Sequence, residues 1–95
     1  MGEVFVMESK QWDVRIFIGE DDNDDVTTAK AVLMTSSGER YESVAYARRN
    51  PDDPPVPSIG DELAAGRALY ELAGKLMRDG AEDVAELAEH GSGAW

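Results

Sequence analysis

All four prolines of this 95-residue chain lie between positions 51 and 57, in the stretch PDDPPVP. A proline fixes φ, removes a backbone donor and biases the residue before it towards an extended conformation. The stretch therefore cannot pair as a central strand, and no helix is expected to begin before Pro57. We predict that Arg48 to Pro57 contains no regular structure and forms a stiff bridge between two structural parts of the chain.

The part before this bridge alternates between two sets of side chains, as a half-buried strand does. The alternation predicts strands over residues 11–18, 27–34 and about 41–48. Turn-forming residues separate these segments in the sequences GEDDNDDV and TSSGER. Connections this short favour an antiparallel meander, because a parallel crossover needs a dozen or more residues.

The core face of the third predicted strand stays undecided. Its residues Ser43, Ala45 and Ala47 are small, whereas Val44 and Tyr46 on the other face are large. The alternation fits either set, so the sequence alone does not determine which one packs against the rest of the domain.

The part after the bridge has the periodicity of an amphipathic helix over about 59–79. Ser58 is a preferred N-cap residue, and Asp61 and Glu62 place negative charge in the first turn. Gly80 is a natural end of this helix, so the following sequence AEDVAELAEH predicts a short second helix. We therefore predict an α+β fold, in which a three-stranded antiparallel meander precedes a long helix and a short C-terminal helix.

The length suits a single small domain over residues 1–95, with a core at about 10–90. Residues 1–9 would form a peripheral arm and residues 91–95 a peripheral tail. The N-terminus lacks the pattern of a signal peptide, and no apolar run approaches the roughly 20 residues that cross a bilayer. We expect a cytoplasmic protein with no membrane contact.

Twenty acidic against nine basic side chains give the chain a net charge of −11. Charge of this sign and size repels phosphate backbones and anionic membrane surfaces at long range. It argues against a generic nucleic-acid binder, although a local basic patch could survive within it. The simplest interpretation is that the charge keeps a small protein soluble.

The sequence contains few of the residue types that commonly act in catalysis. The chain has no cysteine and one histidine, His90, which lies near the C-terminus. A serine, threonine or lysine nucleophile would therefore lack a histidine base in a plausible place. The run EDDNDD resembles the start of a calcium loop, but Val26 and Val32 stand where that loop needs Gly and Glu. We expect no enzymatic activity, no catalytic residues, no metal site and no cofactor.

Three basic side chains form the candidate contact for phosphate, RNA or another partner. Arg48 and Arg49 end the third predicted strand, and Lys30 could lie beside them on the sheet. Two arginines at a strand end can hold a phosphate. Such a pair more often binds nearby acids, which here are Asp52, Asp53 and the acidic turn.

The apolar residues of the long helix spread over about half of its circumference, more than one sheet face usually covers. Part of this arc must be covered by the short C-terminal helix or by a second copy of the protein. We predict a homodimer whose interface includes the helix, because isologous contacts are the commonest arrangement in homo-oligomers. The candidate interface residues on the helix and on one sheet face are Phe17, Val32, Met34, Tyr70, Ala73 and Met77.

Three blocks of the sequence resemble a small actinobacterial family of unknown function, whose fold is classed as like the double-stranded-RNA-binding domain (dsRBD-like). In order and spacing these blocks are QWDVRIFI, TTAKAVL and AYARRNPDDPPVPSIGDELAAGRAL. The resemblance covers about residues 11–78. Its most specific part is the loop and the helix start, with the signature residues Asn50, Pro51, Pro57, Ser58, Gly60 and Asp61.

The resemblance implies a three-stranded antiparallel sheet packed by helices, often as a dimer, with a shape related to ribosome hibernation promoting factors. That shape suggests a role in silencing translation or in stress survival. We predict a non-catalytic homodimeric interaction domain whose specific role the sequence does not give, and for which the resemblance suggests a stress-related role. The alternative is a ribosome- or RNA-associated factor that silences translation and uses Lys30, Arg48 and Arg49.

Overall fold

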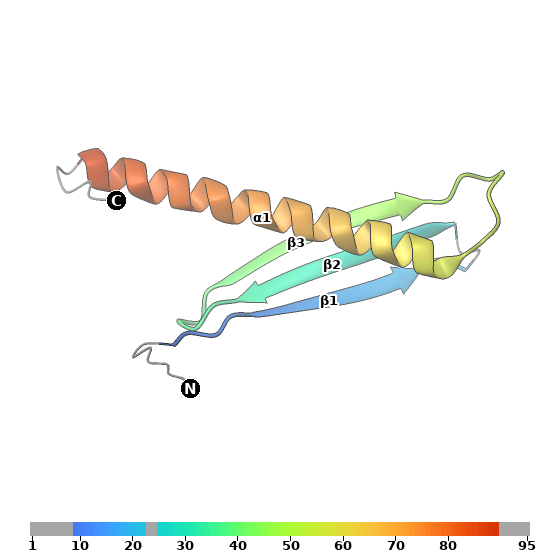
Figure 1. Cartoon of the computed structure of the whole chain (residues 1–95), viewed down its shortest axis with the longest axis horizontal. Helices are drawn as coiled ribbons and strands as arrows, with labels where there is room; N and C mark the ends of the chain where they lie inside the picture. The colour runs from blue at the N-terminus through green and yellow to red at the C-terminus, as the bar shows by residue number, and fades with distance from the viewer. Residues whose placement is uncertain (1–8, 23–24, 90–95) are drawn as a thin grey trace, which may run out of the picture.

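The computed structural model describes residues 9–22 and 25–89. Strands β1 (Asp13–Glu20), β2 (Val26–Met34) and β3 (Arg40–Arg48) precede one long helix, α1 (Pro57–Glu89) (Figure 1). The three strands form one antiparallel sheet in the order β1-β2-β3. The predicted α+β fold and the meander are confirmed. The predicted tail, and all of the predicted arm except Ser9, lie outside the described residues.

Two short hairpin connections join the strands. The backbone N–H of Asp21 donates to the carbonyl of Val26 at 3.1 Å, and the Asp21 carboxylate accepts from the N–H of Asp25 at 2.8 Å. In the second connection Gly38 takes a φ of 93°. Glycine suits that position because a side chain would make a positive φ costly.

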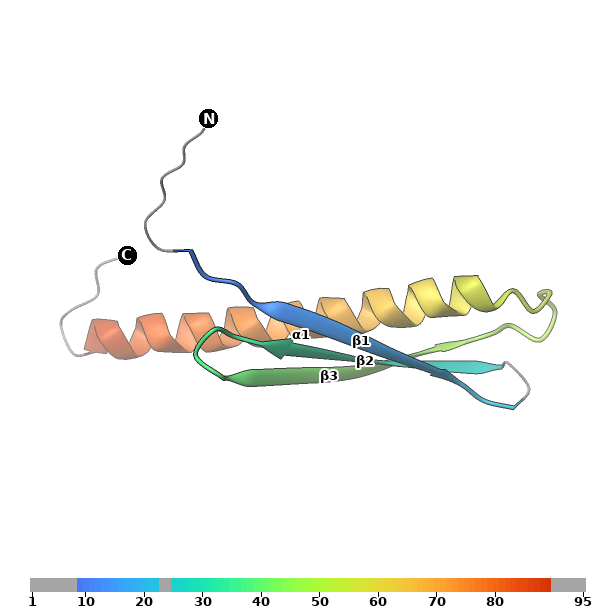
Figure 2. The ribbon, with the colours of Figure 1, turned by 90° about the horizontal axis from the view of Figure 1, so that it is seen from below.

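Helix α1 covers one face of the sheet and lies mainly over β2 and β3 (Figure 2). The core between them consists mostly of alanines, with the members Ala29, Ala31, Leu33, Ala45, Ala47, Ala64, Ala68 and Leu72. Alanines on both sides let the helix backbone approach the sheet closely. The undecided face of β3 is thereby settled, because its small residues are buried while Val44 and Tyr46 are exposed.

One helix replaces the two helices that the sequence predicted. Helix α1 is 33 residues long and passes through Gly80 without a break. A glycine inside a helix costs about 1 kcal/mol relative to alanine, which good helix formers on both sides can offset. No proline follows Gly80, and its φ is not positive. The prediction of a separate C-terminal helix was therefore wrong, and the end of α1 extends beyond the sheet (Figure 1).

Helix α1 begins at Pro57, one residue before the predicted cap. Proline suits the first helical position, because its missing N–H would have no helical partner there. Ser58 is the second helical residue, so the prediction that it caps the helix was wrong. The irregular bridge is confirmed over residues 49–56, since Arg48 still belongs to β3 and Pro57 to α1.

The start of α1 packs tightly against β2. A Cβ atom at Gly60 would lie 2.6 Å from Oγ1 of Thr27, so glycine is what permits this close approach. Asp61 and Glu62 lie beyond the first turn of the helix, which contains no acidic residue. The predicted acidic first turn was wrong because the helix starts earlier than expected.

Candidate interaction surfaces

The three basic residues that the sequence singled out do not converge. Lys30 lies 3.5 Å from the Glu42 carboxylate. The register pairs Val44 with Lys30 and Val26 with Arg48. Lys30 and Arg48 are therefore separated by four residue steps along the sheet, which is about 13 Å. Both side chains lie on the face opposite α1, because their paired neighbours alternate with the buried alanines.

Arg49 is bound to neighbouring residues of its own chain. Its guanidinium binds the Asp25 carboxylate and the Asp53 carbonyl oxygen, each at 2.7 Å, and its backbone N–H donates to the Asp25 carbonyl at 2.8 Å. These contacts fasten the proline-containing loop to the β1–β2 hairpin. Arg49 therefore has a structural role in this loop, which leaves less of its guanidinium for a phosphate.

The signature residues of the loop form local turns. The Asn50 side-chain oxygen accepts from the Asp52 N–H at 3.0 Å, and its carbonyl accepts from the Asp53 N–H at 2.9 Å. Pro51 lies inside this turn. The loop, the strand ends and the start of α1 surround a recess of about 240 Å³, which Arg48 and Arg49 help to line.

The face of the sheet opposite α1 is partly apolar and partly charged. Phe17 and Met34 are exposed there, as the sequence predicted for an interface, but Val32 is already buried. Glu42 lies between Arg40, at 2.6 Å, and Lys30. Desolvation raises the pKa of Glu42, but Arg40 and then Lys30 outweigh it, so the net pKa lies below its ordinary value.

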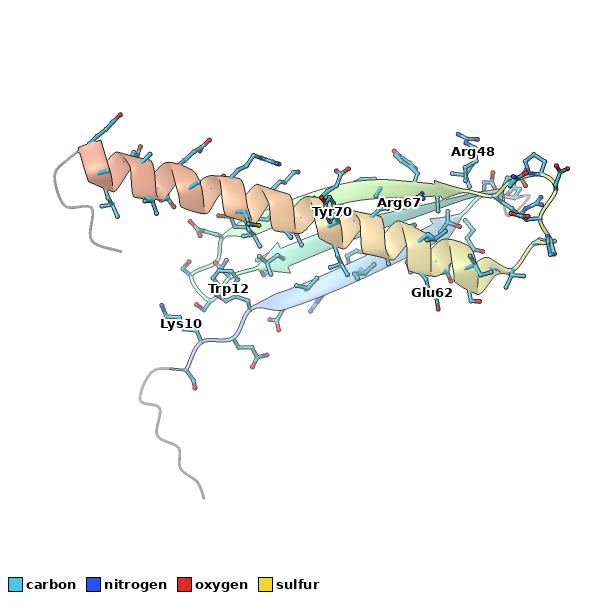
Figure 3. The ribbon with its side chains drawn as sticks, turned by 45° about the horizontal axis from the view of Figure 1, so that its top comes forward. Lys10, Trp12, Arg48, Glu62, Arg67 and Tyr70 are labelled. Atoms are coloured by element: carbon cyan, nitrogen blue, oxygen red, sulfur yellow. The ribbon has the colours of Figure 1, made fainter. Side chains whose placement is uncertain are left out.

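The face of α1 that points away from the sheet carries large apolar side chains. Tyr70 is 83% exposed and Met77 is 74% exposed, and Ala73 between them is also exposed. Figure 3 shows Tyr70 on the helix with Arg67 directed towards β3. Ile59 and Leu63 extend this apolar face towards the helix start. The sequence predicted Tyr70, Ala73 and Met77 as interface candidates, and all three are accessible.

Strand β1 holds an apolar surface that sequence analysis missed. Every residue of β1 is exposed, because α1 lies over β2 and β3 and leaves β1 largely uncovered. Val14, Ile16 and Ile18 pair with buried residues of β2, so they point to the helix side of the sheet. Trp12 lies next to them, before the strand begins (Figure 3). Alternation predicted the strand correctly, but it carries no information on where the helix docks.

Two side chains of α1 bind β3, the strand at the other edge of the sheet. Arg67 donates from its guanidinium to the Tyr46 carbonyl at 2.8 Å, and the Lys75 ammonium donates to the Glu42 carbonyl. Both carbonyls belong to β3, the strand at that edge. Two basic residues of the polar helix face thus hold α1 to the sheet.

Tyr41, near the start of β3, interacts with Asp79 of α1. Desolvation raises the pKa of Tyr41, and a hydrogen bond to the Asp79 carboxylate raises it further. The folded state therefore holds the phenol proton more tightly than the unfolded state does.

A pH dependence follows from this contact. The raised pKa of the Tyr41 phenol adds to the free energy of unfolding, and this contribution is fully present below the unfolded-state pKa of 10.0. The contribution is lost as the pH rises through the pKa of Tyr41 in the folded state. We expect Tyr41→Phe to make the urea midpoint fall less steeply above about pH 10 than it does in the unmodified protein. Equal slopes for the two proteins would show that the phenol–carboxylate contact does not contribute to stability.

The described residues contain no group of three or more His, Cys, Asp or Glu side chains placed to hold a metal ion. His90 lies outside the described residues. Within the described part of the chain, α1 is too polar for its length to serve as a membrane span.

Comparison with known proteins identifies relatives over most of the chain. A family model described as Rv2632c-like matches residues 10–92. The uncharacterized protein Rv2632c of Mycobacterium tuberculosis (strain H37Rv) is 42% identical over 70 residues, which cover 74% of this chain and 73% of that protein. The uncharacterized protein Mb1767 of Mycobacterium bovis is 39% identical over 75 residues, which cover 79% and 77%. These matches confirm the resemblance to a small actinobacterial family.

Proposed function

The chain belongs to the Rv2632c-like family, and we propose that it is a non-catalytic interaction domain that functions as a homodimer. The observation that carries this proposal is the outer face of α1. Tyr70 and Met77 are large apolar side chains on a well-formed helix, yet they are mostly exposed in the single chain. Contiguous apolar surface of this kind commonly marks a protein–protein interaction site.

A second copy can bind this chain only through a surface that its charge leaves free. The net charge of −11 opposes self-association at long range, so a dimer needs a contact surface free of charge. The outer face of α1 provides one, since its exposed residues Ile59, Leu63, Tyr70, Ala73 and Met77 are all uncharged. The basic side chains of Arg67 and Lys75 instead donate hydrogen bonds to backbone carbonyls of β3.

The open face of the sheet favours a second candidate function. In this acidic protein that face is locally basic, because it carries more basic than acidic residues. The basic residues are Arg15, Lys30, Arg40 and Arg48, and the acidic residues are Asp13 and Glu42. Exposed Phe17 and Tyr46 on the same face offer rings on which unpaired bases can stack. These features support a ribosome- or RNA-associated factor that silences translation, as the dsRBD-like resemblance implies. A stress-related role is compatible with either candidate.

The response to salt separates the two functions. Self-association through an uncharged surface should strengthen with added salt, because salt screens the repulsion between two chains of charge −11. Contact with ribosomal phosphates should weaken steeply as salt rises.

We expect sedimentation equilibrium to show tighter self-association at high salt. We also expect the protein to co-sediment with purified ribosomes or duplex RNA no more than an unrelated acidic protein of similar size does. Ribosome binding that is lost with salt would favour the second candidate, and self-association that weakens with salt would contradict the first.

A further inference from the structure

The exposed residues on the outer face of α1 recur with alternating spacings of four and three. Because α1 continues through Gly80, this spacing persists over 59–84, a length of about 39 Å. The positions are Ile59, Leu63, Gly66, Tyr70, Ala73, Met77, Gly80 and Val84, and all of them are exposed. We call this set the outer seam. A seven-residue repeat of uncharged positions is the pattern by which one helix packs along another.

From Leu63 onwards the outer seam is divided by size into two alternating sets, whereas Ile59 at its start is a large residue at the spacing of the small set. Leu63, Tyr70, Met77 and Val84 recur every seven residues and are all large. Gly66, Ala73 and Gly80 recur every seven residues between them and are all small. In packed helices, large side chains insert as knobs into spaces on the facing helix. The seam therefore carries both the knobs and the spaces that could receive them.

The two seam glycines have no explanation within the single chain. A Cβ atom at Gly66 or at Gly80 would meet no other atom within 4 Å. Each glycine nevertheless costs the helix about 1 kcal/mol relative to alanine. This differs from Gly60, where Thr27 leaves no room for a Cβ. Close approach of another molecule at Gly66 and Gly80 would account for both residues.

An antiparallel arrangement of two copies matches the large residues Leu63, Tyr70 and Met77 with small ones. If the two-fold axis passes between Glu71 and Leu72, residue numbers of facing positions add to 143. Met77 then faces Gly66 of the second copy, and Tyr70 faces its Ala73. By the same relation Leu63 faces Gly80, and at each end Val84 faces Ile59. A parallel arrangement in register would instead place large residues beside large ones and small beside small.

The residues beside the outer seam agree with the same arrangement in part. Leu69 and Leu76 flank the seam on one side, and two-fold symmetry brings each near the other in the second copy. Further out, Glu62 comes near Asp83 of the second copy, which is unfavourable because both are acidic. The helix pair should therefore be weakened by repulsion at its two ends.

We propose that a second copy of this chain packs antiparallel along the outer seam, with Met77 inserted over Gly66 of its partner. The two sheets would then lie on the outside of the assembly, with both helices between them. This inference rests on the proposed homodimer and adds its surface, direction and register. Self-complementarity of the seam selects a second copy over an unrelated protein.

Gly66→Leu tests the contact. The single chain has open space at this position and leucine is a better helix former than glycine, so the helix should remain intact by circular dichroism. In the dimer, the added side chain would occupy the space of the partner's Met77. We expect the dissociation constant to rise at least about tenfold in sedimentation equilibrium. Ala85→Leu, which adds bulk to the exposed polar side of the same helix, should leave it nearly unchanged.

Adding Met77→Ala to Gly66→Leu tests the register. The second change removes the side chain that faces position 66, so it should restore much of the lost association.

Asp83→Lys should tighten the dimer about two- to fivefold, because it places a positive charge near Glu62 of the partner.

The outcomes separate this inference from the proposed function. If the unmodified protein is a dimer and Gly66→Leu leaves it unchanged, the outer seam is not the interface, although the homodimer stands. If Gly66→Leu dissociates the dimer but Met77→Ala does not restore it, the proposed register is wrong. If the unmodified protein is a monomer at all accessible concentrations, the homodimer and this inference fail together.

Discussion

Replacing Leu72 with alanine should lower the free energy of unfolding by about 2–5 kcal/mol. Leu72 is 3% exposed and belongs to a core in which most other members are alanines. Alanines have no rotamers with which to fill a cavity, so the space left by Leu72 should stay largely open. Because α1 docks on the sheet through this cluster, the loss should loosen the helix from β2 and β3.

Urea unfolding at a fixed protein concentration measures this loss, since dimerisation makes apparent stability depend on concentration. Val44→Ala is the matched control, because Val44 is an apolar residue on the open face of β3. Its replacement should cost about 1 kcal/mol or less. Equal losses for the two variants would contradict the docking of α1 through Leu72.

Replacing Met77 with aspartate should abolish the dimer at micromolar concentration. In the single chain Met77 is 74% exposed, so a charge there should change the stability of the monomer by only about 0.5 kcal/mol. In the dimer the same charge would be buried without a partner, which costs about 3–5 kcal/mol and raises the dissociation constant more than about a hundredfold. The effect should be larger still because the change occurs in both copies.

Ala85→Asp is the control for Met77→Asp. It adds the same charge to the same helix, at an exposed position away from the outer seam. Sedimentation equilibrium should show a monomer for Met77→Asp and a dimer for Ala85→Asp. Dissociation of both variants would indicate that net charge, and not burial of Met77, controls the assembly.

Local sequence signals predicted the strands and the connector well. Strand periodicity and turn residues act over a few positions, so the predicted segments agree with β1, β2 and β3 to within about two residues. The prolines likewise located the irregular bridge, because each one acts on its own backbone and on the residue before it. These features needed no knowledge of tertiary contacts.

The errors at both ends of the helix have separate physical causes. Pro57 displaced Ser58 as the boundary because proline is itself favourable at the first helical position. Gly80 did not end α1, because a single glycine weakens a helix without requiring a left-handed turn. The second error also hid the outer seam, whose repeat becomes continuous only when 59–84 forms one helix.

The candidate sites depended more strongly on tertiary structure. Arg49 binds Asp25, which is 24 positions away in the sequence and lies in the acidic turn that sequence analysis named among the acids near the two arginines. The exposure of β1 follows from where α1 lies on the sheet. Val32 lies on the opposite face of the central strand, where it is paired with Arg15 and Glu42 of the two neighbouring strands. Tyr70, Ala73 and Met77 were identified correctly as accessible, because the breadth of the apolar arc is visible in the sequence itself.

The molar mass of the unmodified protein in solution tests the homodimer most directly. Light scattering behind size exclusion, over a dilution series at micromolar concentration, reports this mass without a label or a substitution. We expect twice the chain mass of 10.3 kDa, falling towards 10.3 kDa on dilution. A mass of 10.3 kDa that is independent of concentration would contradict it, and would mean that the outer face of α1 remains uncovered by a second copy.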